Sequence, residues 1–414
     1  MVSTLKKLGP GLLFAGAAIG VSHLVQSTRA GADFGLGLLW ALLLVNIFKY
    51  PFFQFGPRYA SATGESLLEG YHKLGKAVLI AYFVLSLGTM FTIQTAVTIV
   101  SAGLAHSLFG DISFLNFGYS SISSVEIWTV ILLSICLMIL FIGKYRTLDK
   151  LIKVIIVTLA ISTVVAVCFA FTAFDRPMSL TQVLPENTTE IAFLIAFMGW
   201  MPAPMDISVW HSIWAIEKKK DESPFTPKDA LLDFNIGYLG AIILGIAFLC
   251  LGYFVMYETG ETFSNKAAVF SNQLIDLYTK SLGNWAYVII GVAAFTTMFS
   301  TTITTLDASP RAMSKSLELL TKRTLKKGYL LWIIILTIGT LIIFFVFASE
   351  MGKLIKIATI LSFLTAPFYA IINYKLISSE HTPKDWRPSL ALHILSWLGI
   401  LFLIGFSLWY LTLL

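Results

Sequence analysis

The chain has 414 residues, of which 57% are hydrophobic and only 13% are charged. Because about a quarter of the residues in a soluble domain are charged, this composition excludes an ordinary soluble protein and predicts an integral membrane protein. The formal net charge of +6 would point to a nucleic-acid partner only with a basic face on a soluble fold, and the sequence has no segment of that kind.

Eleven apolar segments are long enough to cross a bilayer, which takes about 20 mostly apolar residues. They lie near residues 10–28, 35–57, 77–105, 125–143, 152–174, 190–214, 235–257, 284–308, 328–348, 354–374 and 389–413. With the N-terminus placed in the cytoplasm, 22 of the 29 Lys and Arg residues fall on the inside and five fall in outside loops. Because cytoplasmic loops are enriched in Lys and Arg, we expect a multi-pass cell-membrane protein with its N-terminus inside and its C-terminus outside.

Two of the predicted spans are interrupted near their middle. The first contains Gly20 and two polar residues around residue 22, and the sixth contains Gly199, Pro202 and Pro204. Proline removes a backbone donor, and unwound backbone inside a membrane is tolerated only around a cavity or within protein. Broken first and sixth helices therefore predict two inverted five-helix repeats and a transporter's midplane site, although ordinary kinks would give the same pattern. The predicted division is 1–174 for the first repeat, 175–375 for the second and 376–414 for an additional helix.

Enzyme chemistry and ATP-driven pumping find no support in the sequence. There is no GxxxxGK[ST] loop and no HExxH motif. The cysteines Cys136, Cys168 and Cys250 lie in apolar runs without zinc-site or redox spacing, so we interpret them as packing residues. We therefore expect neither an enzyme nor a cofactor.

Sequence similarity to a known family begins in the first 70 residues. Gly9-Pro10, Ala30-Gly31-Ala32, Phe34-Gly35, Arg58 and Thr63-Gly64 resemble the pattern of the NRAMP family (natural resistance-associated macrophage proteins). Met201-Pro202 resembles the family's Met-Pro in helix six, and the tract from Ser300 to Thr304 resembles its Ser/Thr tract in helix eight. This resemblance implies the all-α LeuT-type fold with two inverted five-helix repeats, alternating access and a metal cation as cargo.

The chain departs from the family pattern where that family binds its metal. In the family, helix one carries Asp-Pro-Gly-Asn, whose Asp and Asn bind a divalent transition metal. These positions are Gly20, Val21, Ser22 and His23 in this sequence. The resemblance aligns the family's methionine ligand with Met201 and its carbonyl ligand with Met198, while the acidic pair of helix three falls on Gln94 and Val97.

This change alters the cargo that the site can accept. A divalent ion stripped of water at mid-membrane needs compensating negative charge. What remains is neutral and soft, which suits Cu⁺ or Zn²⁺ with His23 and Met201 as ligands, or a small organic solute. His23 could also carry a proton, because histidine titrates near neutral pH. The candidate substrate-binding residues lie at the two breaks and are Gly20, Val21, Ser22, His23, Met198, Met201 and Asp206.

Further polar residues within the spans could each have a role in transport or a purely structural role. The ion-coupling candidates lie in the eighth span and are Ser300, Thr301, Thr304 and Asp307. Their oxygens could bind Na⁺ together with carbonyls of the first break, or they could bond across helices, with Asp307 paired to Arg311. Lys49 could remain at membrane depth and repel a cationic cargo, or it could snorkel to the interface, which the sequence slightly favours.

The leading hypothesis is a secondary transporter in the lipid bilayer that moves a small ion or solute and has no nucleic-acid partner. Family resemblance indicates a metal cation as cargo, and the residues leave room for a neutral or organic solute. Coupling to Na⁺, to H⁺ or to no ion stays open. A non-transporting membrane receptor or scaffold is a further alternative.

Overall fold

The structure is a computed structural model that describes residues 9–112, 122–142, 145–221, 226–347 and 350–413. Within these ranges every regular element is a helix. In chain order the helices are α2 (Pro10–Ala18), η1 (Ser22–Ser27), α3 (Thr28–Phe34), α4 (Leu39–Thr63), α5 (Leu67–Leu74), α6 (Lys76–Phe109), α7 (Ser124–Ile142), α8 (Tyr145–Ala173), α9 (Thr188–Trp200), α10 (Ile207–Asp221), α11 (Pro227–Met256), α12 (Ala267–Leu282), α13 (Ala286–Thr321), α14 (Gly328–Phe347), α15 (Met351–Ser378), η3 (Lys384–Trp386) and α16 (Leu390–Leu411).

The described helices account for the predicted spans. Eight of them, α4, α6, α7, α11, α13, α14, α15 and α16, are each long and apolar enough to cross a membrane. The pair Pro10–Ala18 and Ser22–Phe34 makes a ninth span that is bent by 45°. Two shorter apolar stretches, Val157–Ala173 and Thr188–Trp200, lie where the sequence predicts the fifth span and the first half of the sixth.

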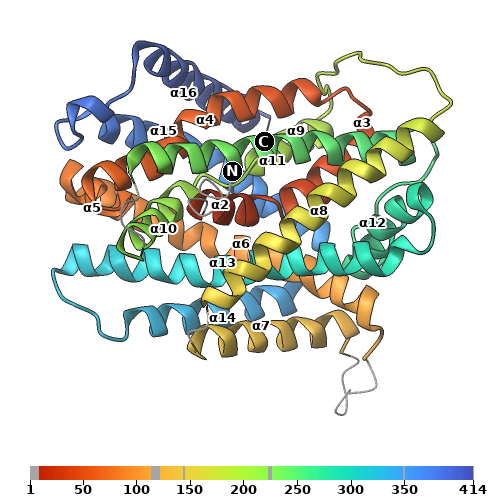
Figure 1. Cartoon of the computed structure of the whole chain (residues 1–414), viewed down its shortest axis with the longest axis horizontal. Helices are drawn as coiled ribbons and strands as arrows, with labels where there is room; N and C mark the ends of the chain where they lie inside the picture. Colours follow the sequence, from red (N-terminus) through yellow and green to blue (C-terminus); the bar gives the residue numbers. More distant parts are fainter. Residues whose placement is uncertain (1–8, 113–121, 143–144, 222–225, 348–349, 414) are drawn as a thin grey trace.

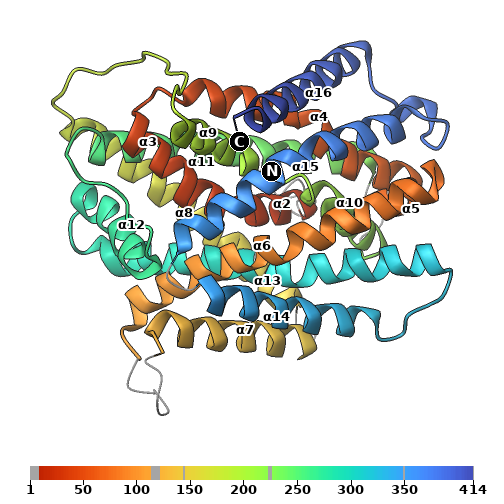
Figure 2. The same cartoon turned by 180° about the vertical axis from the view of Figure 1, so that it is seen from behind.

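The helices run side by side along the long axis of the molecule (Figure 1). In both views α7 and α14 form one edge of the bundle, and α4 and α16 form the opposite edge (Figures 1 and 2). The short helix α5 lies at one end of the bundle, and α12 lies at the other end. Helix α2 lies between these edges, and most of its side chains are buried.

Both predicted breaks are present. The first span stops its α-helix at Ala18 and resumes as the wider turns of η1. The sixth span ends α9 at Trp200 and begins α10 at Ile207. The intervening Pro202 and Pro204 have no backbone N–H with which to continue the helix, so the interruption of this span follows directly from its sequence. The division into repeats at 174/175 and 375/376 remains a prediction.

Candidate functional site

A small cavity lies between the two breaks. It has a volume of about 20 Å³, which is room for roughly one water molecule. Residues from both broken spans, α6 and α13 line it, namely Ala17, Ala18, Val21, Ser22, Ile93, Val97, Trp200, Pro204, Ile207, Trp210, Thr301 and Thr305. Because no charged side chain belongs to this lining, the space between the breaks is a neutral one.

His23 lies beside this cavity and does not line it. Its side chain is fully buried. Its Nε2 atom lies 2.9 Å from the Ala241 carbonyl oxygen on α11, and its Nδ1 atom lies 2.6 Å from Ser22 Oγ. A carbonyl oxygen can only accept, so Nε2 carries a hydrogen and donates it to Ala241. Both ring nitrogens are therefore engaged within the protein, and neither is presented to a metal ion.

Met201, the second candidate metal ligand, approaches the same face of α11 as His23. A Cβ atom placed on Gly245 would lie 3.3 Å from Met201 Sδ and 3.7 Å from His23 Nε2. The two predicted ligands thus come together against one glycine of α11. The structure describes no group of three or more His, Cys, Asp or Glu residues that could hold a metal within its described ranges.

The break in the sixth span is occupied by a lysine. The Lys49 side chain is fully buried, and its Nζ atom donates to the carbonyl oxygens of Met198 at 2.7 Å, Gly199 at 2.8 Å and Met201 at 3.2 Å. The helical partner of the Met198 carbonyl would be the backbone N–H of residue 202, and this residue is a proline. The ammonium group supplies the donor that the backbone lacks.

The snorkelling that the sequence slightly favoured for Lys49 is therefore wrong. The reason is the position of its acceptors, because the free carbonyls at the end of α9 hold the ammonium group inside the bundle. A lysine within a span and a proline four residues after a carbonyl are both visible in the sequence. Only the fold shows that the two meet.

Asp206 lies at the other end of the same break, one residue before α10 begins. Its carboxyl group is almost fully buried, with 5% of the residue exposed. Thr89 Oγ1 on α6 donates to its Oδ2 atom at 3.0 Å, and Tyr369 on α15 also hydrogen-bonds to it. A basic group is favourable at the C-terminus of a helix and an acidic group at the N-terminus. Lys49 at the C-terminus of α9 and Asp206 at the N-terminus of α10 follow this rule.

Of the eighth-span candidates, Ser300, Thr301 and Thr304 lie in the tract that includes the cavity wall, and Asp307 lies apart from them. Thr301 lines the cavity and donates to the Gly16 carbonyl oxygen at 3.2 Å. A Cβ atom on Gly20 would lie only 3.0 Å from Thr301 Oγ1, so the first break packs closely on α13. Ser300 and Thr304 are buried, and Ser300 Oγ has no hydrogen-bond partner among the described residues.

Asp307 lies away from the breaks. Its carboxylate accepts from Arg311 Nε at 2.7 Å and from the Tyr329 hydroxyl group at 2.6 Å. This is the pairing with Arg311 that the sequence offered as the alternative to ion coupling. No described contact links Asp307 to the break residues.

Neutral contacts also replace the family's acidic pair in helix three. Gln94 on α6 donates to the Thr302 carbonyl oxygen at 3.2 Å and accepts from Thr305 Oγ1 at 2.7 Å. Val97 lines the cavity beside Thr305. The side chains at these two positions hold α6 against α13 and offer no carboxylate.

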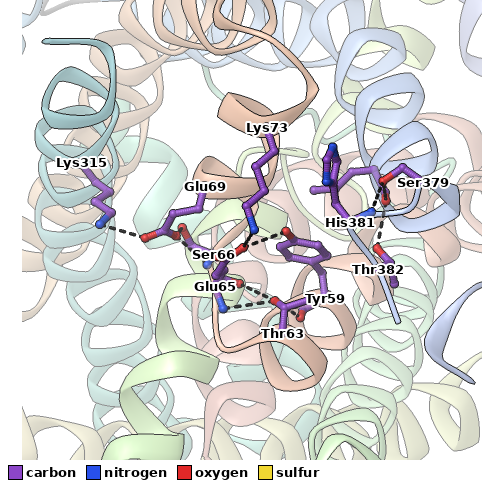
Figure 3. Close-up of polar contacts among 11 residues, drawn as sticks. Tyr59, Thr63, Glu65, Ser66, Glu69, Lys73, Lys315, Ser379, His381 and Thr382 are labelled. Atoms are coloured by element: carbon purple, nitrogen blue, oxygen red, sulfur yellow. Dashed lines mark hydrogen bonds and ion pairs between the residues drawn. The ribbon is translucent and has the colours of Figure 1, made fainter. Parts of the chain in front are cut away.

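A larger polar cavity of about 280 Å³ opens near the α5 end of the bundle. Its lining includes Glu69, Arg311 and Lys315. Lys315 Nζ lies 2.9 Å from Glu69 Oε1 (Figure 3), which ties α13 to α5. Burial acts to raise the pKa of Glu69, but hydrogen bonds from Ser66 and Lys315 outweigh it and hold that pKa below its usual value.

The comparisons with known proteins agree with this architecture. The family model described as natural resistance-associated macrophage protein-like matches residues 11–413. "Uncharacterized protein PM0681" of Pasteurella multocida is 36% identical over 408 residues, which cover 97% of this chain and 90% of that protein.

Two solved structures show the same fold at low identity. The manganese transporter of Eremococcus coleocola superposes with a TM-score of 0.73 at 13% identity, covering 98% of this chain and 86% of that one. MhsT in complex with L-phenylalanine gives a TM-score of 0.64 at 13% identity and covers 96% and 98%. Matched over nearly its whole length, the chain belongs to the Nramp family of membrane transporters and has the LeuT-type fold.

Proposed function

We propose that the protein is a secondary transporter that works by alternating access around the breaks of its first and sixth spans, and that its cargo is a small organic solute. The observation that carries the proposal is the ammonium group of Lys49 on the carbonyl oxygen of Met198, the position that the family uses to bind metal. The positive charge of an ammonium group at that position repels a divalent cation.

The composition of the breaks supports the same cargo. The family's Asp and Asn are replaced by Gly20 and His23, and His23 uses both ring nitrogens within the protein. The space between the breaks has a neutral, largely apolar lining that includes Trp200 and Trp210, and such a lining is typical of sites for organic molecules. Its volume of about 20 Å³ is far smaller than such a site, so alternating access must widen it before a solute enters. The fold itself is compatible with either class, because one structural neighbour is named as a manganese transporter and the other contains L-phenylalanine.

We also infer the orientation from charge. The α5 end carries Lys73, Arg311 and Lys315, and the bias of Lys and Arg along the whole chain assigns this end to the cytoplasm. The polar cavity at this end would then be the cytoplasmic vestibule, with the C-terminus on the outside of the cell membrane.

The test uses purified full-length protein. Isothermal titration with Mn²⁺, Zn²⁺ and Cu⁺ is expected to give no binding heat, and proteoliposomes are expected to take up no Mn²⁺ above empty vesicles. A reconstituted manganese transporter of the family serves as the positive control. A thermal-shift screen of amino acids, carboxylic acids and nucleobases is expected to yield a stabilising solute, whose radiolabelled uptake is then measured. Mn²⁺ uptake at the level of the control would overturn the proposed cargo.

A further inference from the structure

The end of α9 forms a carbonyl cage that suits a cation. Its oxygens belong to Met198, Gly199 and Met201, and all three point to a single atom. The C-terminal end of a helix carries partial negative charge, and carbonyls at the end of a broken transporter helix are groups that coordinate ions. Here the ion-like group is Lys49 Nζ, which arrives from the neighbouring helix α4.

The match between donor and acceptors is complete. An ammonium group has three N–H donors, and the cage offers three carbonyl oxygens within 2.7–3.2 Å. No donor of Lys49 is left for a cargo molecule. The ammonium group also occupies the space in which the cage would bind an ion from solution. Its positive charge would in addition repel such an ion.

The three carbonyl acceptors account for the buried position of Lys49. Taking an ammonium group out of water carries a large desolvation penalty unless hydrogen bonds offset it. Lys356, which lies near the start of the predicted span 354–374, is exposed. Of these two lysines in predicted spans, Lys49 is buried against the carbonyl cage and Lys356 is exposed.

We infer that Lys49 is a tethered cation, whose ammonium group takes the place of an ion from solution in the carbonyl cage at the end of α9. The transport cycle then needs no free metal or sodium ion at this position. The inference rests on the proposed function for its transport role, and the cage itself is tested independently of any cargo.

The test replaces the tethered cation by a free one. Lys49→Ala vacates the cage, and the unfolding temperature of the purified variant is measured in detergent with methylammonium chloride or tetramethylammonium chloride at equal concentration. Methylammonium keeps three N–H donors and tetramethylammonium keeps none. We expect methylammonium alone to raise the unfolding temperature of K49A, by about 2 °C at a concentration about tenfold above its dissociation constant.

The matched controls are the wild-type protein and Lys356→Ala, which lacks an exposed lysine. Neither is expected to respond differently to the two salts. Equal responses of K49A to methylammonium and tetramethylammonium would overturn the inference. Mn²⁺ uptake by the wild-type protein together with a specific methylammonium response of K49A would refute the proposed cargo and leave the tethered cation in place.

A second pair of variants covers the case in which K49A cannot be purified. Lys49→Gln keeps two N–H donors, and Lys49→Met has a similar length and keeps none. We expect more monodisperse protein from K49Q than from K49M by fluorescence-detected size-exclusion chromatography. Equal recovery of the two variants would show that the cage needs no donor and would overturn the inference.

Discussion

The two broken spans differ in how they satisfy the backbone groups that lose their helical hydrogen bonds at the break. The first break keeps its backbone largely paired by passing into π-helical turns, and neutral side chains such as Ser22 and Thr301 complete it. The sixth break contains two prolines and is completed by two buried ionisable groups, Lys49 and Asp206. The comparison teaches that a buried basic and a buried acidic side chain lie at the sixth break, while the residues described at the first break, where the resemblance places the family's metal carboxylate, include no carboxylate and no ammonium group.

The largest expected effect comes from closing the space at the sixth break. A Cβ atom on Gly199 would lie 2.1 Å from the Thr359 carbonyl oxygen of α15, and this backbone atom cannot move aside without shifting its helix. Gly199→Ala should destabilise the fold by about 3 kcal/mol or more, read as a lower unfolding temperature or a loss of monodisperse protein. Gly88→Ala is the matched control, because nothing lies within 4 Å of its Cβ position. Equal stability of the two variants would mean that α9 and α15 are not in contact here.

Removing the acidic group at the sixth break should have the next largest effect. Asp206→Ala removes an acceptor from the hydroxyl groups of Thr89 and Tyr369, and a buried hydroxyl group left without its partner costs about 1–3 kcal/mol. Asp206→Asn keeps an oxygen acceptor and should lose less. The exposed Asp276 on α12 provides the control variant Asp276→Ala. An unfolding temperature of D206A equal to that of D276A would argue that the sixth break does not need this carboxyl group.

The first break should tolerate change better. His23→Ala removes the hydrogen bonds to Ser22 and Ala241, and a typical hydrogen bond contributes about 1 kcal/mol. We expect a folded protein with a reduced rate of solute uptake in proteoliposomes. His393→Ala on the outer helix α16 alters a contact with Tyr374 of α15 and is the control for loss of an imidazole. Unchanged uptake by H23A would remove His23 from the transport site.

The smallest effect is expected for the ion pair of Lys315 and Glu69 at the α5 end. This pair is partly exposed, so it should contribute less than the buried groups at the sixth break. Glu69→Gln should lower stability by about 0.5 kcal/mol. Because the pKa of Glu69 is lowered in the folded state, this contribution is present above the unfolded-state pKa near 4.5 and is lost as the pH falls through the lower folded-state value.

The measurement is the unfolding temperature of the wild-type protein and E69Q at pH 7 and near pH 4. The difference between them should shrink at the lower pH. Glu261→Gln removes an exposed pair with Lys280 and should show no difference at either pH. A wild-type advantage over E69Q that grows on acidification would contradict the assigned direction of the Glu69 pKa shift.

Local sequence features were sufficient to predict the breaks and insufficient to predict their partners. Gly199, Pro202 and Pro204 interrupt a helix wherever they occur together, so the sixth break followed from three residues. Its completion depends on Lys49, which is 149 positions away from Met198 in the chain. Periodicity carries no information about such a contact, and a lysine in an apolar run is equally compatible with the interface and with the interior.

The candidate site shows the same limit. The sequence grouped His23 with Met201 as candidate ligands, and both approach Gly245 on α11. It could not predict that the His23 imidazole would be engaged by Ala241, which lies 218 positions away. Hydrogen-bond satisfaction in a membrane interior is a property of packed helices, and it decided which predicted ligands remain available to a cargo.

The most direct test of this account is a crystal structure of the full chain grown with Mn²⁺ and examined by anomalous scattering at the manganese edge. We expect Lys49 Nζ within hydrogen-bonding distance of the Met198, Gly199 and Met201 carbonyl oxygens and no anomalous peak between the two breaks. A manganese peak on the Met198 carbonyl, with the Lys49 side chain turned away, would contradict the account.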